Sequence, residues 1–283
     1  MFNQTLAATL KGPGLGWDRI EFAVDATRVG VAVMRRDGYK SPIVFLHGFG
    51  STKEDYADIA RYPIFDGHPV IAYDAPGCGA TDCDTPSAID IPFQQKTAQA
   101  VLAYFGFDRF HLVGHSMGGL TALMLAHANR ESVLSFTNIE GNLASEDCFL
   151  SRQTFEYGQD DAEYFLDAFI DRVFRSPGFA NAVYATGLRG KVRARAVASI
   201  FRSMVELSDH AGLLQKFLAL PCPKSFVFGD AHRSLSYLGQ LRDNGVALFE
   251  IPACGHFPMY SNPPLMWRAI SDFIHGIEGN IRR

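Results

Sequence analysis

The fold is decided by the stretch Phe110-His111-Leu112-Val113-Gly114-His115-Ser116-Met117-Gly118-Gly119. It opens with a short apolar run typical of a strand buried on both faces, and the residues from Gly119 to Asn129 carry apolar side chains at helical spacing. A serine between two glycines at such a strand-to-helix turn matches the Gly-X-Ser-X-Gly nucleophile elbow. The turn strains the serine backbone, and glycine on either side leaves room that larger side chains would fill. The stretch therefore predicts a nucleophilic Ser116 at the carboxyl end of a buried strand.

Similar apolar runs recur along the chain and predict further parallel strands. They are Ile43–Leu46, Val70–Tyr73, Val133–Phe136, Phe226–Phe228 and Ala247–Ile251. Amphipathic helical spacing is found in Lys53–Ala60, Phe93–Phe105, Gly119–Asn129 and Pro264–Ile274. Alternating residues from Ile20 to Val33 predict an antiparallel pair of strands before them. We therefore expect an α/β fold with a doubly wound, mostly parallel sheet, whose ligand site lies at the carboxyl ends of the strands.

One region interrupts this alternation. Residues 143–218 contain no convincing strand, whereas Ala162–Ile170 and Val192–Leu207 have helical spacing. We expect a helical cap, or lid, over residues 143–218, inserted into an α/β core domain made of residues 1–142 and 219–283. Aromatic residues of the cap could line an apolar pocket, although for any single one we favour packing of the cap onto the core: Phe155, Tyr157, Tyr164, Phe165, Phe169 and Phe174.

A second glycine-rich loop, His47-Gly48-Phe49-Gly50, follows the strand Ile43–Leu46. Its glycines allow a sharp turn at the carboxyl end of a strand that neighbours the Ser116 strand. The backbone N–H groups of Phe49 and Met117 are the expected oxyanion hole. For His47 we expect a structural role, in which its ring fixes the loop through hydrogen bonds.

The order of these motifs resembles the α/β-hydrolase superfamily. The matching motifs are His47–Gly50, Asp74–Gly79, Gly114–Gly119 and Gly255–Phe257. They are most similar to a cap-bearing branch that includes esterases, lactonases, carbon–carbon bond hydrolases, epoxide hydrolases and haloalkane dehalogenases. In that superfamily the catalytic histidine follows the last strand, so the resemblance implies that His256 is the base. Histidine suits this role because its ordinary pKa lies near neutrality.

Five other histidines are not expected to act in catalysis. His68, His111, His127, His210 and His275 fall before strands, within them, on helices or near the end of the insertion, and we expect packing or surface roles for them.

For the third catalytic residue, the common family pattern implies an acid after Phe226–Phe228, where Asp230 lies. Asp230 follows Gly229 immediately, however, and the usual acid position a few residues later holds His232 and Arg233. The rival is Glu140, one strand after the nucleophile, the position from which certain haloalkane dehalogenases take their acid. A carboxylate there is costly unless it is paired, so we favour Glu140 and keep Asp230 as the alternative.

A serine nucleophile predicts the type of reaction. Dehalogenases and epoxide hydrolases of this superfamily use aspartate at the elbow, whereas a serine suits attack on an acyl carbon. The leading hypothesis is a carboxylesterase-like hydrolase that forms an acyl-enzyme with a small, largely apolar substrate. A lactonase, a thioesterase or a carbon–carbon bond hydrolase could use the same residues. A non-catalytic small-molecule receptor of this fold is the alternative from another class.

Composition and charge limit the classes of partner that we expect. The 283 residues carry a net charge of −4 and are 47% hydrophobic, which predicts neither nucleic-acid binding nor membrane attachment. Met1–Gly12 lacks the pattern of a secretory signal, so we expect a cytoplasmic protein. The cysteines are scattered and predict free thiols. No cofactor and no metal is expected, because His, Asp and Glu do not cluster at ligand spacings. The sequence does not indicate the oligomeric state.

Overall fold

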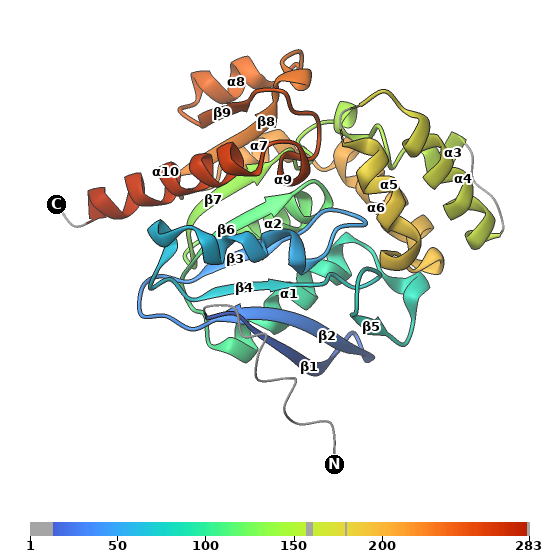
Figure 1. Ribbon diagram of the computed structural model, residues 1–283, viewed down its shortest axis with the longest axis horizontal. Helices are drawn as coiled ribbons and strands as arrows, with labels where there is room; N and C mark the ends of the chain where they lie inside the picture. The colour runs from blue at the N-terminus through green and yellow to red at the C-terminus, as the bar shows by residue number, and fades with distance from the viewer. Residues whose placement is uncertain (1–13, 157–160, 179, 282–283) are drawn as a thin grey trace.

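The computed structural model describes residues 14–156, 161–178 and 180–281, so Met1–Gly12 lies outside the described residues. Its centre is a nine-stranded sheet in the order β1-β2-β4-β3-β6-β7-β8-β9, with β5 paired to β2 (Figure 1). The strands are β1 Gly16–Val24, β2 Thr27–Arg36, β3 Ile43–Leu46, β4 Val70–Tyr73, β5 Asp82–Cys83, β6 Phe110–His115, β7 Val133–Ile139, β8 Lys224–Gly229 and β9 Ala247–Ile251. The first two strands form the expected antiparallel pair, and the six from β4 to β9 in this order run parallel. The predicted doubly wound, mostly parallel sheet is confirmed.

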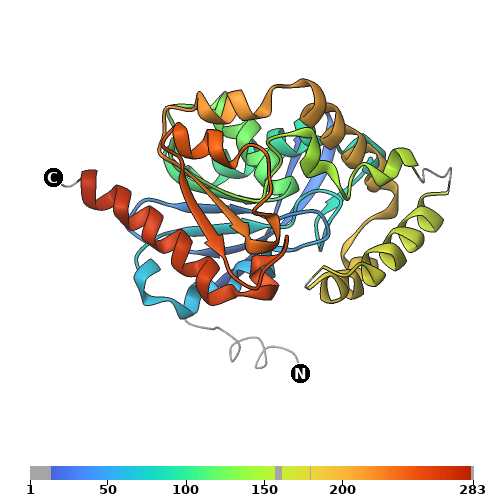
Figure 2. The same ribbon diagram turned by 90° about the horizontal axis from the view of Figure 1, so that it is seen from above.

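Helices cover both faces of this sheet (Figure 2). One face carries α10 Pro263–Ile281 and η1 Lys53–Arg61, and on this face Phe45 of β3 packs against Tyr56 and Trp267. The other face carries α1 Ile91–Phe105 and α2 Met117–Ala128, which contact each other. The predicted helix at Lys53–Ala60 forms as consecutive 3-10 turns rather than as an α-helix. Shorter elements complete the core: η2 Pro63–Phe65, η3 Pro86–Ala88, η5 Asp230–His232, α8 Leu238–Asp243 and α9 Pro258–Ser261.

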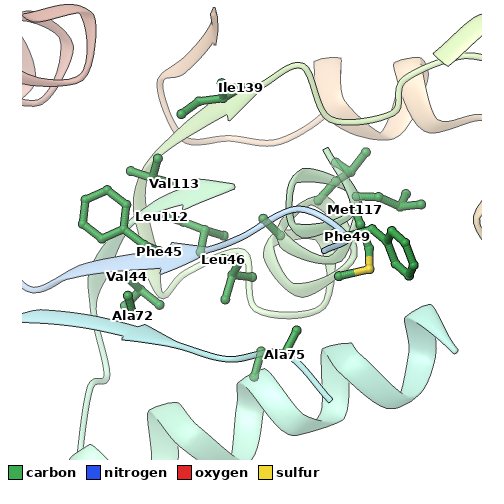
Figure 3. Packing of buried hydrophobic residues seen from close by; sticks show 14 of the residues in the cluster. Val44, Phe45, Leu46, Phe49, Ala72, Ala75, Leu112, Val113, Met117 and Ile139 are labelled. Carbon is green, nitrogen blue, oxygen red and sulfur yellow. The ribbon is translucent and has the colours of Figure 1, made fainter. Parts of the chain in front are cut away.

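The middle of the sheet is buried because helices cover it on both faces. All four residues of β3 are buried, and so are all six of β6, the strand that leads into the glycine-flanked serine. Figure 3 shows Val44, Phe45 and Leu46 of β3 next to Leu112 and Val113 of β6 in this core. Such packing fixes the carboxyl ends of β3 and β6 beside each other, and with them the two loops that follow.

The chain between β7 and β8 is helical in its described part. It contains η4 Ser145–Cys148, α3 Gln153–Glu156, α4 Ala162–Arg175, α5 Asn181–Lys191, α6 Ala194–His210 and α7 Leu213–Leu218. Helices α3 to α6 lie together at one side of the molecule in both views (Figures 1 and 2). The last helix instead returns to the core, where α7 contacts α2 and Phe217 packs against Phe136. The division into a core and a cap over residues 143–218 stays a prediction.

Candidate active site

Ser116 lies on a strained turn between β6 and α2. Its φ of 50° and ψ of −121° are unfavourable for a residue with a side chain, and they lift it out of the helix as the N-cap. The flanking glycines make this turn possible. A Cβ on Gly118 would lie 2.2 Å from the Leu46 carbonyl oxygen, and one on Gly114 would lie 2.6 Å from the Gly118 carbonyl oxygen. Close backbone packing therefore requires glycine on both sides of the serine.

His256 lies in the loop after β9 and reaches Ser116. Its Nε2 is 2.8 Å from Ser116 Oγ, and its Nδ1 is 2.9 Å from Glu140 Oε2. A carboxylate only accepts, so Nδ1–H donates to Glu140 and Nε2 is left to accept from the serine hydroxyl. His115 also fixes the loop, since its Nε2 lies 2.8 Å from the His256 carbonyl oxygen. Ser116, His256 and Glu140 thus form one hydrogen-bonded chain, in which His256 has the tautomer that a general base needs.

Glu140 follows β7 directly and is buried, with a positive φ of 48°. Its Oε1 accepts from the Gly229 amide at 2.7 Å, while its Oε2 accepts from His256 and also from His232 at 2.6 Å. Burial alone raises the pKa of Glu140, but the hydrogen bonds from the two histidines outweigh it and lower this pKa to about 2. Glu140 is therefore ionised at neutral pH despite its burial.

Asp230, the alternative acid, does not contact His256 in the structure. Its carboxylate accepts from the backbone amides of Ala253 and Cys254, both at 3.0 Å. These two bonds hold the loop that carries His256 and lower the pKa of Asp230. Ala253 needs this support because its φ is 52°. The structure thus brings Glu140, and not Asp230, to the histidine.

His232 is a site residue that the sequence analysis missed. It belongs to η5, after β8, and its Nδ1 donates to the same Glu140 oxygen that His256 uses. The hydrogen bond to Glu140 raises the pKa of His232. The available signal was its position, since His232 occupies the place where the common family pattern has the acid. A histidine at this position can donate a hydrogen bond to the carboxylate that follows β7.

The expected oxyanion donors lie close to Ser116. The loop after β3 passes over the serine, because a Cβ on Gly48 would come within 3.1 Å of Ser116 Cβ. In the part of the chain that the structure describes, the amides of Phe49 and Met117 donate to no protein acceptor. His47 holds this loop as expected: its Nδ1 is 2.7 Å from the Gly48 carbonyl oxygen, and its Nε2 accepts from the Ala75 amide.

A small apolar cavity opens beside Ser116 and His256. Its volume is about 20 Å³, little more than one water molecule occupies. Its lining comes from the core loops and from the helical segment 143–218: Phe49, Ser116, Asp147, Phe149, Leu150, Ser151, Tyr184, Phe201, Met204, His256 and Phe257. Phe149 is half exposed, and its ring meets the His256 ring edge to face at 5.0 Å. A wider cleft of about 300 Å³ lies on the outer side of Phe149 and also reaches His256.

Among the described residues, the aromatic side chains considered for the pocket lining are not part of it. Phe165 and Phe169 are buried in a cluster with Phe49 and Phe201, so they support the pocket wall from behind. Three others are exposed on the helical segment: Phe155, Tyr164 and Phe174. Tyr157 lies outside the described residues. Phe165 and Phe169 thus show the packing role that we favour for any single residue, and helical spacing alone does not tell which face of a helix meets the site.

The described residues contain two groups with the spacing of metal ligands. Glu140, His232 and His256 form the first, but their facing atoms are already engaged with one another. His68, His275 and Glu278 form the second, away from Ser116. All five cysteines are free thiols. None of the helices in the described ranges combines the length and apolar character needed to span a bilayer.

Comparisons with known proteins agree with this architecture. Residues 43–269 match the model of a family described as the alpha/beta hydrolase family. The chain is 34% identical over 92 residues to a proline iminopeptidase of Clostridium botulinum, covering 31% of each protein. It is 27% identical over 118 residues to a 2-hydroxy-6-oxononadienedioate/2-hydroxy-6-oxononatrienedioate hydrolase of Klebsiella pneumoniae, covering 41% of each. These alignments span well under half of each relative's length.

A solved structure matches over nearly the whole chain. The thermophilic esterase from Thermogutta terrifontis superposes with a TM-score of 0.71 at 18% identity, covering 92% of this chain and 99% of the esterase. Identity this low supports the fold and not a shared substrate.

Proposed function

Since the chain belongs to the alpha/beta hydrolase family, we propose that it is a serine hydrolase that cleaves a carboxylic ester, or a related acyl bond, of a small and largely apolar substrate. The hydrogen-bonded chain from Ser116 through His256 to Glu140 carries this proposal. A serine that hydrogen-bonds to a histidine, with a buried carboxylate behind that histidine, is the arrangement for acyl transfer.

In the first half of the reaction, Ser116 Oγ attacks the acyl carbon while its proton passes to His256 Nε2. The imidazolium that forms is stabilised by the ionised Glu140, which keeps Nδ1–H in place. The carbonyl oxygen becomes an oxyanion held by the amides of Phe49 and Met117. The bond to the leaving group then breaks, His256 returns the proton to the leaving oxygen, and the acyl group stays on Ser116.

In the second half, His256 takes a proton from a water molecule, and the resulting hydroxide attacks the acyl carbon. The acid product leaves as Ser116 recovers its proton from His256. Neither half needs a metal or an organic cofactor as reactant, because the four proton transfers through His256 and the two acyl transfers balance.

The cavity sets the expected size of the substrate. At about 20 Å³ it has room for a group of about the size of a methyl, and larger acyl chains require Phe149 or the helical segment 143–218 to move. We propose this segment as the lid of the site, since Phe149, Tyr184, Phe201 and Met204 come from it. Aromatic and aliphatic walls favour apolar acyl groups over charged ones.

A graded substrate panel tests the proposal. Wild type and Ser116→Ala are assayed on p-nitrophenyl esters of increasing acyl length, a thioester, a lactone, a prolyl amide and a carbon–carbon-cleavable diketone. We expect turnover of the short-chain esters and a loss on the order of 10⁴- to 10⁶-fold in Ser116→Ala. Preference for another member of the panel would revise the bond that is cleaved. Binding of panel compounds without turnover by wild type would favour a receptor and contradict the proposal.

A further inference from the structure

Four ionisable side chains gather at the edge of the sheet opposite to Ser116. His68 precedes β4, and His111 is the second residue of β6; since β4, β3 and β6 are parallel neighbours, their starting ends lie together. The end of α10 covers this edge, on the side of the molecule away from helices α3 to α6 (Figure 1). It contributes His275 and Glu278, one helical turn apart and so on one face.

Each of the three histidines is held through its Nδ1. His68 Nδ1 lies 2.8 Å from the Ser41 carbonyl oxygen, and His275 Nδ1 lies 2.9 Å from the Ser271 carbonyl oxygen. Because a carbonyl oxygen only accepts, both Nδ1 atoms carry a hydrogen, and in a neutral ring the lone pair is on Nε2. His111 Nδ1 lies 2.8 Å from Ser135 Oγ, a hydroxyl that can donate or accept, so this bond holds the ring without fixing its tautomer. Metal-binding histidines are typically fixed by such a bond on the other ring nitrogen.

The Nε2 atoms point at one carboxylate without hydrogen-bonding to it. His68 Nε2 is 3.7 Å from Glu278 Oε2, and His111 Nε2 is 3.7 Å from Glu278 Oε1. These separations exceed a hydrogen bond, and both Nε2 atoms are buried without a hydrogen-bond partner among the described residues. The side chains of His68 and His111 are at most 1% exposed. A buried nitrogen without a hydrogen-bond partner costs free energy, and a bound ligand would remove this cost.

We propose that His68, His275 and Glu278 bind a divalent transition-metal ion of the zinc class, with His111 beside the other oxygen of the Glu278 carboxylate. The ligand atoms of the first three lie within 4.8 Å of one another. Two ligands on one tetrahedral zinc are about 3.3 Å apart, so a small contraction closes the site. Imidazole and carboxylate donors suit zinc, and two histidines with one carboxylate leave the fourth tetrahedral position to a water molecule.

The alternative is a set of charged histidines paired with Glu278. Geometry opposes it, because both Nε2 atoms stand 3.7 Å from the carboxylate, beyond hydrogen-bond distance. In a neutral ring the lone pair of His68 Nε2 faces the carboxylate. A cation between them removes that repulsion and ties the last helix to the sheet.

Metal binding to the whole protein tests the proposal. Chelator-treated wild type is dialysed against Zn²⁺, and bound zinc and Tm are measured. We expect one tightly bound zinc per chain and a rise in Tm of about 5 °C at a hundredfold excess over Kd. His275→Gln and Glu278→Gln each weaken binding at least about 100-fold, since loss of an outer-shell partner alone costs about 10- to 100-fold. Circular dichroism of the metal-free variants checks that they fold.

Control variants separate this site from the active site. His127→Gln removes a histidine outside the cluster, and His232→Gln disrupts the other group with ligand spacing; both retain tight zinc binding if the inference holds. Absence of bound zinc in wild type overturns it. So does zinc that stays in His275→Gln and Glu278→Gln but is lost from His232→Gln.

Discussion

Glu140 satisfies both of its carboxylate oxygens with donors from three separate residues, Gly229, His232 and His256. Changing it to glutamine keeps the shape but replaces one acceptor oxygen by a donor, so His256 loses both its preferred tautomer and the charge that stabilises its protonated form. We predict that Glu140→Gln lowers kcat by about 10³- to 10⁴-fold, measured on the best ester of the panel, with a native circular dichroism spectrum.

Asp230→Asn is the matched control, because it also neutralises a carboxylate near the His256 loop. Asp230 only holds the amides of Ala253 and Cys254, each through a separate oxygen, so an asparagine keeps one of these two hydrogen bonds. We expect a loss of less than about 10-fold, in line with a changed hydrogen bond rather than a lost catalytic group. Greater damage from Asp230→Asn than from Glu140→Gln would assign the acid to Asp230.

His232 makes stability depend on pH. Glu140 raises the pKa of His232, so the charged ring stabilises the fold fully below its unfolded pKa of about 6.5, and this contribution fades as the pH rises through the folded pKa. We predict that His232→Gln lowers the free energy of unfolding most near pH 5.5 and least near pH 9. Urea denaturation of both proteins across this range measures the difference. A gap that widens with rising pH would contradict the assigned pair.

At the scale of elements, the turn from β6 into α2 depends on close contact with the end of β3. A methyl group on Gly118 would lie 2.2 Å from the Leu46 carbonyl oxygen, which belongs to a buried strand and cannot move aside. We predict that Gly118→Ala destabilises the protein by about 1 to 3 kcal/mol and abolishes esterase activity, since Ser116 shifts with the turn. Gly239→Ala in α8 is the control, because nothing lies within 4 Å of its added Cβ; equal losses in both would refute this explanation.

Phe149, directly after η4, forms one wall of the small cavity beside Ser116. Its ring stands against His256 and separates the small cavity from the wider outer cleft. We predict that Phe149→Ala raises kcat/KM for hexanoyl relative to acetyl esters by about 10-fold or more, because each methylene accommodated in an apolar pocket is worth about 10-fold or more. Phe155→Ala, which truncates an exposed ring outside the cavity lining, should leave the ratio unchanged. An unchanged ratio in Phe149→Ala would show that another element limits acyl length.

At the scale of the whole molecule, the fold could be predicted because parallel strands buried on both faces leave continuous apolar runs. Every predicted core strand from Ile43–Leu46 to Ala247–Ile251 has its counterpart in the sheet. Several short elements of the helical segment were not foreseen, such as α5, because their boundaries depend on tertiary contacts. The active-site triad could be proposed from loops that follow parallel strands, since these loops must meet at one edge of the sheet.

The other contacts of the site join residues that lie far apart in the sequence, and a local sequence pattern does not reveal them. His232 is 92 residues from Glu140, and only the pairing of β7 with β8 brings them together. The His68, His111, His275 and Glu278 cluster arises in the same way, from two strand starts and the final helix. Neither could be found by looking for ligands at short spacing in the sequence.

In the proposed mechanism Ser116 is a nucleophile that His256 activates. Labelling with a fluorophosphonate, followed by peptide mass spectrometry of the adduct, measures this reactivity. We predict one adduct, located on Ser116, which is absent from Ser116→Ala and strongly slowed in His256→Ala. A wild-type protein that stays unlabelled, or an adduct on a residue that persists in Ser116→Ala, would contradict the claim.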